Sequence, residues 1–545
     1  MIKELLLHNY RSYLRETRVP LGKITLLFGP NSSGKSSIVS VLSLLRQTLE
    51  NPNPLNALVF REPKGLVDLG RFQDVVSDGN SDRSLTIGIT GSFSGDRWRA
   101  STTRDLVSPS KGVRGWERSL FGRRPPVYGV KASFGHDQDT GAAIVNEVEY
   151  FFDQRREPFV RLEATQNDAV QLVDLGESTE LWRGEFDMYR GVYGFADGPS
   201  PDQQWRNAVG KRFGITSGVS GRTTKKDLEE LKPDSPAAKY YALGEEMLSA
   251  ISSDDYLKYA AAKVARWQWE LFERSHFLIG DWLGVDEVWD ARFGGHFEAD
   301  LAKAIGLQAS VDVFSIPAAI ESASEKLRGL LSSVLPLGPL RELPRRVYES
   351  AGIKHEGVGV RGQYVAEYLA QNPEEIEEAN EWLQKMETGH SVMPRYSADR
   401  RGVTLDLFDL SRSTEVSVSL ADVGFGISQA LPILVQCLAS RGKVITIEQP
   451  EVHVHPRLQA NMADLFIEAT RRDNQCIVET HSEHLVLRLL KRIREGVLDA
   501  DDVQILYINR GDEGSKIIPI DISSEGELLS EWPGGFFEER LDELF

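Results

Sequence analysis

The stretch G-P-N-S-S-G-K-S-S at Gly29–Ser37 determines how the rest of the chain is interpreted. It fits the pattern G-x-x-x-x-G-K-[ST] of a phosphate-binding P-loop. The apolar run Ile24–Phe28 precedes it and predicts a buried strand, and Ser36–Leu49 follows with the apolar spacing of a helix. Because strand, glycine loop and helix come in the order that a P-loop requires, we favour this interpretation over a chance glycine-rich loop.

The residue types in this loop predict a site for the phosphates of a nucleotide. Gly29 and Gly34 allow the backbone to curl, so that successive N–H groups point at phosphate oxygens. The start of the following helix adds partial positive charge. Lys35 is expected to reach the β- and γ-phosphates, and Ser36 to give an oxygen to Mg²⁺. The predicted nucleotide-binding residues of the loop are Asn31, Ser32, Ser33, Gly34, Lys35, Ser36 and Ser37.

The composition predicts a soluble chain with more than one domain. Its 545 residues exceed one ordinary core, and a net charge of −18 argues against a bulk nucleic-acid coat. No run of about 18 apolar residues is present, so we expect no membrane span. The N-terminus lacks the apolar core of a signal peptide. Cys437 and Cys476 lie in apolar runs, which predicts buried thiols and a reducing cytoplasm.

The segment before the P-loop carries a family resemblance. Asn9–Tyr13, read N-Y-R-S-Y, stands 20 residues ahead of Gly29. This arrangement resembles the opening of RecF-type and structural-maintenance-of-chromosomes (SMC) ATPases, in the ABC-like branch of P-loop proteins. The resemblance implies an α/β fold with a mixed sheet flanked by helices, ATP and Mg²⁺ as ligands, and Arg11 at the nucleotide. It also implies a glutamine at Mg²⁺, for which Gln73 is the nearest candidate and an ordinary polar turn residue the alternative.

A glycine-rich turn in the second half occupies the place of the ABC signature motif. Val423–Leu438 predicts such a turn followed by an apolar helix. Gly424, Gly426, Ser428 and Gln429 match the motif in kind, without the usual L-S-G-G-Q. The resemblance implies that Gly426 and Ser428 contact a nucleotide held by the other subunit of a head-to-tail homodimer.

The next apolar run has the pattern of a Walker B strand. Val444–Ile447 predicts a central strand that ends at Glu448, a carboxylate that holds Mg²⁺ through water. The family usually has an acidic pair here, and Gln449 takes the position of the catalytic glutamate. An amide can orient water but cannot accept its proton. Three alternatives therefore stay open: Glu451 supplies the base, turnover is slow, or ATP serves only as a dimer clamp.

Three histidines near these strands have competing interpretations. His453 and His455 lie on one side of an extended segment, which is a spacing found in metal sites. The family pattern H-x-H-P instead assigns them to a loop at the dimer interface, and we favour that interpretation. His481 follows the buried run Cys476–Val478 and matches the switch histidine that contacts the γ-phosphate; a structural histidine is the alternative. The predicted catalytic residues are Glu448, Gln449, Glu451 and His481.

We divide the chain into an ATPase N-lobe (1–80), an insertion (81–335), an ATPase C-lobe (336–510) and a C-terminal tail (511–545). The insertion is predicted to be strand-rich and then helical, without the heptads of a long coiled coil. Its basic segments Arg104–Arg124 and Lys211–Lys226 are candidates for nucleic-acid contact, with solvated loops as the alternative. In the C-lobe, Asn372–Glu387 predicts a helix capped by Asn372.

Two further segments narrow the resemblance. Pro336–Gly352 and the tail Trp532–Phe537 resemble bacterial AAA-type or OLD-like (overcoming lysogenization defect) ATPases, many of them encoded near anti-phage genes. No paired acids of a nuclease domain are evident, so an effector is expected to be a separate protein. The sequence thus predicts an ATPase that regulates a nucleic-acid-directed or effector activity in antiviral defence or DNA maintenance. A non-hydrolysing, ATP-clamped scaffold is the alternative, and a transporter subunit is disfavoured.

Overall fold

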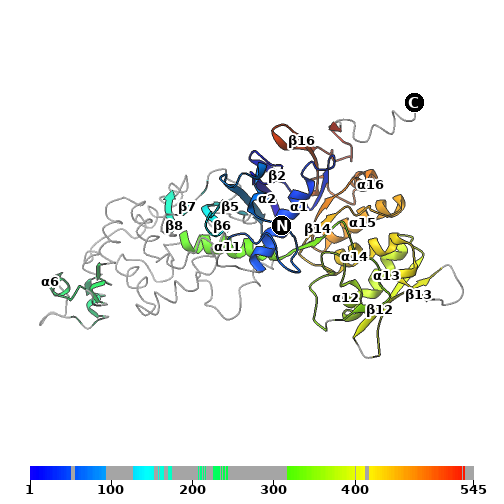
Figure 1. Cartoon of the computed structure of the whole chain (residues 1–545), viewed down its shortest axis with the longest axis horizontal. Helices are drawn as coiled ribbons and strands as arrows, with labels where there is room; N and C mark the ends of the chain where they lie inside the picture. Colours follow the sequence, from blue (N-terminus) through cyan, green and yellow to red (C-terminus); the bar gives the residue numbers. More distant parts are fainter. Residues whose placement is uncertain are drawn as a thin grey trace. The chain divides into compact units, whose positions relative to one another are not determined.

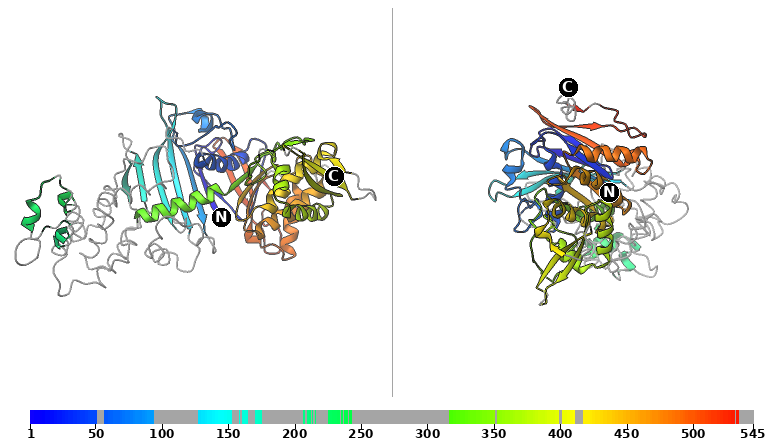
Figure 2. Two further views of the ribbon diagram at one scale, coloured as in Figure 1. Left: turned by 90° about the horizontal axis from the view of Figure 1, so that it is seen from below. Right: turned by 90° about the vertical axis from the view of Figure 1, so that its right-hand side faces the viewer.

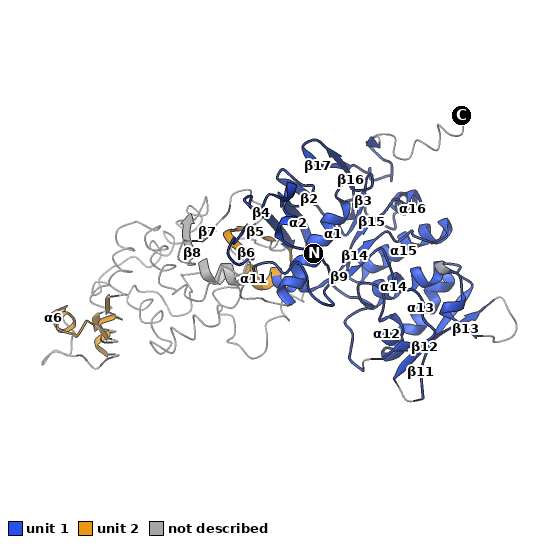
Figure 3. Ribbon diagram, viewed as in Figure 1, with its two compact units in different colours: residues 1–91, 134–143, 328–545 blue, residues 92–133, 144–327 orange. Residues whose placement is uncertain are grey.

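The structure is a computed structural model of the chain (Figure 1). It divides into two compact units, which Figure 3 distinguishes by colour: Met1–Gly91 with Phe134–Ala143 and Arg328–Phe545, and Ser92–Ser133 with Ile144–Leu327. The residues that it describes are 1–50, 56–93, 127–152, 158, 160–164, 170–174, 206–207, 209–211, 213, 215, 225–233, 235, 237–239, 241–242, 316–350, 352–398, 401–410, 417–530 and 532–533.

The first unit is built on a six-stranded mixed sheet. Its strand order is β17-β16-β3-β15-β14-β9, and all pairs are parallel except β16 with β17. The residues of β3 and β15 are all buried because helices cover the sheet, which explains why these strands read as continuous apolar runs. The strand bounds are β3 Ile24–Phe28, β9 Val334–Leu337, β14 Val444–Glu448, β15 Gln475–Glu479, β16 Val503–Gly511 and β17 Gly514–Ile520.

Four helices pack on or beside this sheet. Helix α1 (Lys35–Glu50) contacts β9, β14 and β15, whereas α14 (Phe425–Ala439) contacts β14. Helix α15 (Pro456–Arg471) contacts β3 and β15, and α16 (Glu483–Arg494) packs against α15. Since β3, β15 and β14 are parallel neighbours, their carboxyl ends lie at one edge of the sheet, where α/β proteins bind ligands.

Two further groups of strands belong to the first unit. In the first group, β1 pairs with β2 and with β4, and both pairs are antiparallel; the short α2 and η1 lie nearby. The second group is a separate sheet with the order β10-β12-β11, in which β13 pairs with β12. Helices α12 and α13 pack against β11 of this sheet. The bounds are β1 Ile2–His8, β2 Thr17–Pro20, α2 Phe72–Val75, η1 Ser77–Gly79, β4 Leu85–Ser92, β10 Tyr348–Glu349, α12 Val365–Gln371, α13 Glu374–Lys385, β11 His390–Tyr396, β12 Gly402–Asp409, β13 Ser417–Ser419, η4 Leu420–Asp422 and η5 Ala500–Asp502.

The second unit contains β7 and β8, most of β5 and β6, and most of the long helix α11. The strands follow the order β5-β6-β7-β8, and α11 lies across them in Figure 2, in light green over cyan. The Tyr150 hydroxyl of β6 and the Ser324 hydroxyl of α11 lie 2.9 Å apart in a buried hydrogen bond, which ties helix to sheet. The bounds are β5 Val127–His136, β6 Ala143–Phe152, β7 Val160–Ala164, β8 Val170–Asp174, α6 Lys225–Glu229 and α11 Ile316–Ser332.

The predicted strands and helix around the P-loop and the Walker B run are confirmed, and so are the two buried cysteines. The predicted helix cap at Asn372 is wrong. Asn372 ends α12 instead: its side-chain amide donates to the Tyr368 carbonyl, and α13 begins at Glu374 after Pro373. Among the described helices, none combines the length and the apolar character that a membrane crossing requires.

Part of the predicted insertion lies outside the described residues. This applies to Arg104–Arg124, to residues 243–315 of the part that the sequence predicts to be helical, and to most of Lys211–Lys226. Of the basic side chains in that last segment, Lys225 and Lys226 begin α6 and form exposed ion pairs with Glu229 and Glu230, four residues further on. Contact with nucleic acid therefore stays a prediction.

Candidate nucleotide-binding site

The loop between β3 and α1 has the backbone shape that its glycines predict. Gly29 and Gly34 have φ angles of 138° and 111°, in the region that favours glycine. A Cβ atom on Gly29 would lie 2.0 Å from the Ile508 carbonyl oxygen, and one on Gly34 would lie 2.6 Å from the Ser12 hydroxyl. Both positions therefore require glycine for space as well as for conformation.

Lys35 is almost fully buried at the start of α1, with 3% of its surface exposed. Its ammonium donates to the carbonyls of Gly29 and Pro30, at 2.8 Å each, so it closes the loop onto itself. Burial lowers the pKa of Lys35, and the Glu479 carboxylate opposes this effect. A phosphate that entered the loop would give this buried cation a full opposite charge in place of two carbonyl dipoles.

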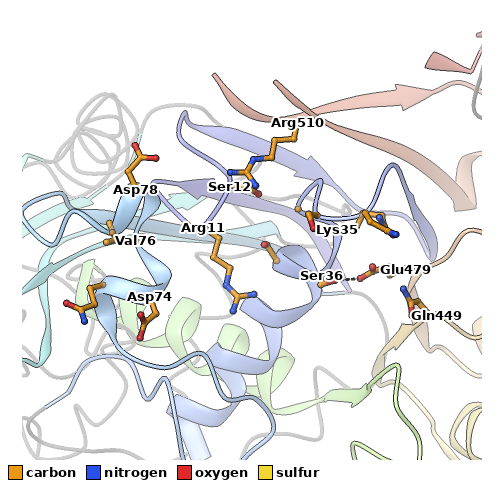
Figure 4. A pocket seen from close by; sticks show the side chains of 16 residues that line it. Arg11, Ser12, Lys35, Ser36, Asp74, Val76, Asp78, Gln449, Glu479 and Arg510 are labelled. Atoms are coloured by element: carbon orange, nitrogen blue, oxygen red, sulfur yellow. Dashed lines mark hydrogen bonds between the residues drawn. The ribbon is translucent and has the colours of Figure 1, made fainter. Parts of the chain in front are cut away.

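Ser36 forms a direct link between the P-loop and the adjacent strand. Its hydroxyl donates to the Glu479 carboxylate at 2.7 Å, as Figure 4 shows. Glu479 is the last residue of β15 and only 4% exposed. Burial raises the pKa of Glu479, while the Ser36 hydroxyl and the Lys35 ammonium lower it. No local motif in the sequence indicates a role for Glu479, although this residue ends a buried strand immediately before Thr480 and His481.

Glu448 and Gln449 follow the next strand. Glu448 pairs in register with Glu479, and burial together with that second carboxylate raises the pKa of Glu448 to about 7. Gln449 has a φ angle of 47°, and its backbone N–H donates to the Glu479 carbonyl at 2.7 Å. The left-handed turn at Gln449 ends β14 and directs this side chain, rather than that of Glu448, to the cavity described below.

The side chain of Arg341 stabilises the turn at Gln449 through hydrogen bonds to its backbone carbonyls. Its guanidinium donates to the Glu448 carbonyl at 2.9 Å and to the Gln449 carbonyl at 3.4 Å. The residue is only 5% exposed, and burial lowers its pKa to about 10, so it remains a cation at neutral pH. The neighbouring Leu340 and Leu343 are 76% and 64% exposed, so Arg341 connects an exposed loop to the Walker B turn.

We expect Arg341→Met to lower the free energy of unfolding by about 2 kcal/mol, because it leaves two strand-end carbonyls without their buried cation. The midpoint of thermal unfolding measures this loss. Arg346→Met is the matched control: Arg346 pairs with Asp422 on the surface, where an ion pair contributes little. Equal midpoints for the two variants would contradict a supporting role for Arg341.

Glu451 and His481 form the second turn of the site. The Glu451 carboxylate accepts from the Thr480 hydroxyl and from the His481 backbone N–H, at 2.7 Å each. These two hydrogen bonds fix the residues that follow β15. Each of the two carboxylate oxygens of Glu451 accepts one of them. Burial and the nearby Lys35 lower the pKa of His481, which favours a neutral imidazole at neutral pH.

The cavity at this edge of the sheet has a volume of about 540 Å³. It brings together residues from the N-terminal loop, the P-loop, α2 and the ends of β14, β15 and β16 (Figure 4). Gln73 and Arg11 thus face the P-loop across the same cavity. The lining residues are Arg11, Ser12, Asn31, Ser32, Gly34, Lys35, Ser36, Ser37, Gln73, Asp74, Val76, Asp78, Gly79, Gln449, Glu479 and Arg510.

Several predicted site residues lie elsewhere. Ser33 is buried beneath the loop, where its carbonyl accepts from the Ser515 hydroxyl. Ser428 is 4% exposed in the first turns of α14, and Gly426 lies beside the His453 carbonyl. The residues that do not line the cavity are Ser33, Gly426, Ser428, Glu448, Glu451 and His481.

Two tyrosines of the N-terminal motif Asn9–Tyr13 form hydrogen bonds with the P-loop and with α1. The Tyr13 hydroxyl donates to the Gly34 carbonyl at 3.1 Å, and the Tyr10 hydroxyl lies 3.0 Å from that of Ser40 on α1. Both tyrosines are completely buried. Arg11 has a φ angle of 51°, and it lines the cavity together with Ser12, whereas Tyr10 and Tyr13 pack inward.

The paired histidines His453 and His455 lie between β14 and α15. His455 caps α15: its ring nitrogen accepts from the Arg457 backbone N–H at 3.3 Å. Across the described residues, no group of three or more His, Cys, Asp or Glu side chains is arranged to hold a metal ion. The assignment of His453 and His455 to a loop at a dimer interface stays a prediction.

Family models match most of the chain piece by piece. One described as "AAA ATPase domain" matches residues 1–97, and one described as "AAA domain, putative AbiEii toxin, Type IV TA system" matches residues 287–488. Residues 1–97 and 287–488 are thus similar to ATPase domains of the AAA type. The first match includes the P-loop and the second includes β14 and β15, so the two matches together contain residues on both sides of the cavity. A third model, "Protein of unknown function (DUF3696)", matches residues 498–545.

Other comparisons add little to this assignment. The chain has no significant sequence match among curated proteins. Among solved structures, it is similar to an Smc head domain bound to the C-terminal domain of ScpA, derived from Pyrococcus furiosus (14% identity, TM-score 0.35, 100% of this chain and 98% of that chain). It is also similar to the SMC head domain from Thermotoga maritima (9% identity, TM-score 0.34, 96% and 99%).

Proposed function

We propose that this chain is an AAA-type ATPase that binds ATP with Mg²⁺ in the cavity beside the P-loop and hydrolyses it slowly. The observation that carries the proposal is the convergence of Lys35, Ser36 and Glu479 at one sheet edge. The donor set fits the nucleotide, since a buried cation and the N-terminus of α1 face the cavity. It fits the metal too, because the half-buried Glu448 and the buried Glu479 pair in register and each raises the need for a nearby cation, as the raised pKa values of both carboxyls indicate.

Each side chain has a role in this proposal. Lys35 and the loop N–H groups bind the phosphates, and Ser36, Glu448 and the facing Gln73 are the residues that would hold Mg²⁺. The metal, when bound, neutralises charge that develops on the phosphates. Gln449 orients water at the end of β14, and Glu451 fixes the backbone that carries His481. A site with an amide in place of the usual base is expected to turn over slowly.

We further propose that two copies close head to tail, with each nucleotide between Lys35 of one chain and the start of α14 of the other. Ser428 is buried in the single chain, so its contact with a partner's nucleotide requires the first turns of α14 to move on closure. The closed state would control a separate effector, in antiviral defence or DNA maintenance. The basic segments Arg104–Arg124 and Lys211–Lys226 are proposed to contact nucleic acid.

Lys35→Ala tests the nucleotide site. We expect its affinity for ATP to fall more than tenfold, because a buried charge-assisted contact with the phosphates is lost. Binding of a fluorescent ATP analogue at equilibrium measures the change. Lys23→Ala is the control, since Lys23 forms an exposed pair with Asp502. Unchanged affinity in Lys35→Ala would overturn the proposal.

One observation favours a second function, an ATP-clamped scaffold that does not hydrolyse. Gln449 stands at the cavity where a base is expected, and Glu451 is committed to Thr480 and His481. Steady-state phosphate release, together with the sedimentation mass of the full chain with and without MgATP, separates the two functions. Undetectable turnover with ATP-dependent dimers would favour the scaffold.

A further inference from the structure

Glu479 occupies a position between the two strands that define the site. Its strand, β15, lies between β3, which leads into the P-loop, and β14, which ends at Glu448. Its Cα pairs in register with Glu448 on one side and with Leu27 on the other. The carboxylate at this central position faces the first turn of α1, where it accepts the hydrogen bond from Ser36 (Figure 4).

The other two carboxylates at this edge are less available to a ligand in the cavity. Glu451 has each oxygen engaged by a donor, the Thr480 hydroxyl or the His481 N–H. Glu448 does not line the cavity, because the chain turns at Gln449 and Arg341 holds the carbonyls of both residues. Of Glu448, Glu451 and Glu479, only Glu479 lines the cavity together with Ser36.

We propose that Glu479 is the carboxylate that completes the Mg²⁺ site with Ser36. The acidic pair that Gln449 interrupts directly after β14 is thereby replaced by a pair on two adjacent strands, Glu448 and Glu479. This inference rests on the proposed nucleotide site and adds a metal-binding residue to it.

The spacing of the two oxygens agrees with this role. The Ser36 hydroxyl and the Glu479 carboxylate are 2.7 Å apart. Neighbouring ligands of an octahedral Mg²⁺, each about 2.1 Å from the metal, lie about 3.0 Å from each other. A small movement therefore converts the hydrogen bond into two neighbouring metal ligands, or into one ligand and one contact through water. Both groups are hard oxygen donors, the type that Mg²⁺ prefers.

The test is the Mg²⁺ dependence of nucleotide binding by the full chain. A fluorescent ATP analogue is titrated in EDTA and at rising MgCl₂, with the wild type, Glu479→Gln, Glu448→Gln and the control Glu513→Gln, an exposed carboxylate near the β16–β17 turn. We expect Glu479→Gln to raise the Mg²⁺ concentration of half-maximal effect at least tenfold, with no loss of affinity in EDTA. Glutamine keeps the acceptor for the Ser36 hydroxyl, and a thermal unfolding curve in EDTA checks that the variant folds.

The outcomes separate this inference from the proposed function. If Glu479→Gln keeps the wild-type Mg²⁺ dependence while Glu448→Gln loses it, the metal is held from β14 and the inference is wrong. If Lys35→Ala still weakens binding in that case, the nucleotide site stands without it. If the wild type binds no nucleotide in either EDTA or Mg²⁺, both proposals fall.

Discussion

Gln449→Glu is expected to raise the steady-state rate of ATP hydrolysis by roughly 10²-fold, with little change in nucleotide affinity. The amide of Gln449 can position a water molecule but cannot take its proton, whereas a carboxylate of the same length can do both. The backbone directs this side chain to the cavity, since the Gln449 N–H is bonded to Glu479 and its carbonyl to Arg341. The substitution therefore changes the chemistry at a position that the structure already holds.

Phosphate release at saturating MgATP measures the effect of Gln449→Glu. Gln384→Glu serves as the matched control, because Gln384 is an exposed residue of α13. A variant that binds ATP as the wild type does, yet turns over no faster, would show that residue 449 does not limit water activation. That result would favour the scaffold function.

Gln449→Glu is also expected to lower the stability of the folded chain when no nucleotide is bound. It places a third carboxylate beside Glu448 and Glu479, whose pKa values burial already raises. Unpaired like charges at a buried edge destabilise the folded state, so the unfolding midpoint should fall without ligand and recover with MgATP. Recovery of the midpoint would connect the carboxylates to the metal by a measurement that does not depend on turnover.

The strands of the site were predictable because each is an apolar run buried on both faces. Ile24–Phe28 and the run that ends at Glu448 are examples, and parallel strands between helices have this composition. The glycines at 29 and 34 were equally readable, since their φ angles exclude most other residues. Apolar runs and glycines of this kind predict strands and turns because both depend only on residues that are close in the sequence.

Contacts between distant segments were not predictable in the same way. Arg341 lies 107 residues before Glu448, and no local pattern shows that its guanidinium supports that turn. The role of Glu479 depends on β15 lying between β3 and β14, which is a property of the sheet order. The predicted cap at Asn372 failed because this residue instead ends α12, with its amide on the Tyr368 carbonyl.

Glu448 is expected to make the nucleotide-free chain less stable as the pH rises from about 4.5 to about 7. Burial, together with the Glu479 carboxylate, raises the pKa of Glu448 from its ordinary value of 4.5 to about 7. Between these values the folded chain keeps a proton that the unfolded chain releases, so unfolding becomes easier with each step in pH. Below pH 4.5 both states are protonated, and above pH 7 both are ionised, so the stability levels off.

Glu448→Gln should abolish this contribution to the pH dependence. The difference corresponds to on the order of 3 kcal/mol between pH 4.5 and pH 8, with the variant gaining relative to the wild type as the pH rises. Unfolding midpoints of both chains in EDTA across this range measure it. The exposed Glu349 on β10 supplies the control, since Glu349→Gln should follow the wild-type curve.

Mg²⁺ with nucleotide should flatten the same curve in the wild type, because a bound cation stabilises the ionised carboxylates. The midpoint of the wild type at pH 8 should then rise more on addition of MgATP than that of Glu448→Gln. Parallel curves for the wild type and Glu448→Gln in EDTA would contradict a folded chain in which Glu448 keeps its proton up to about pH 7. They would also remove the uncompensated charge on which the case for a metal at this edge partly depends.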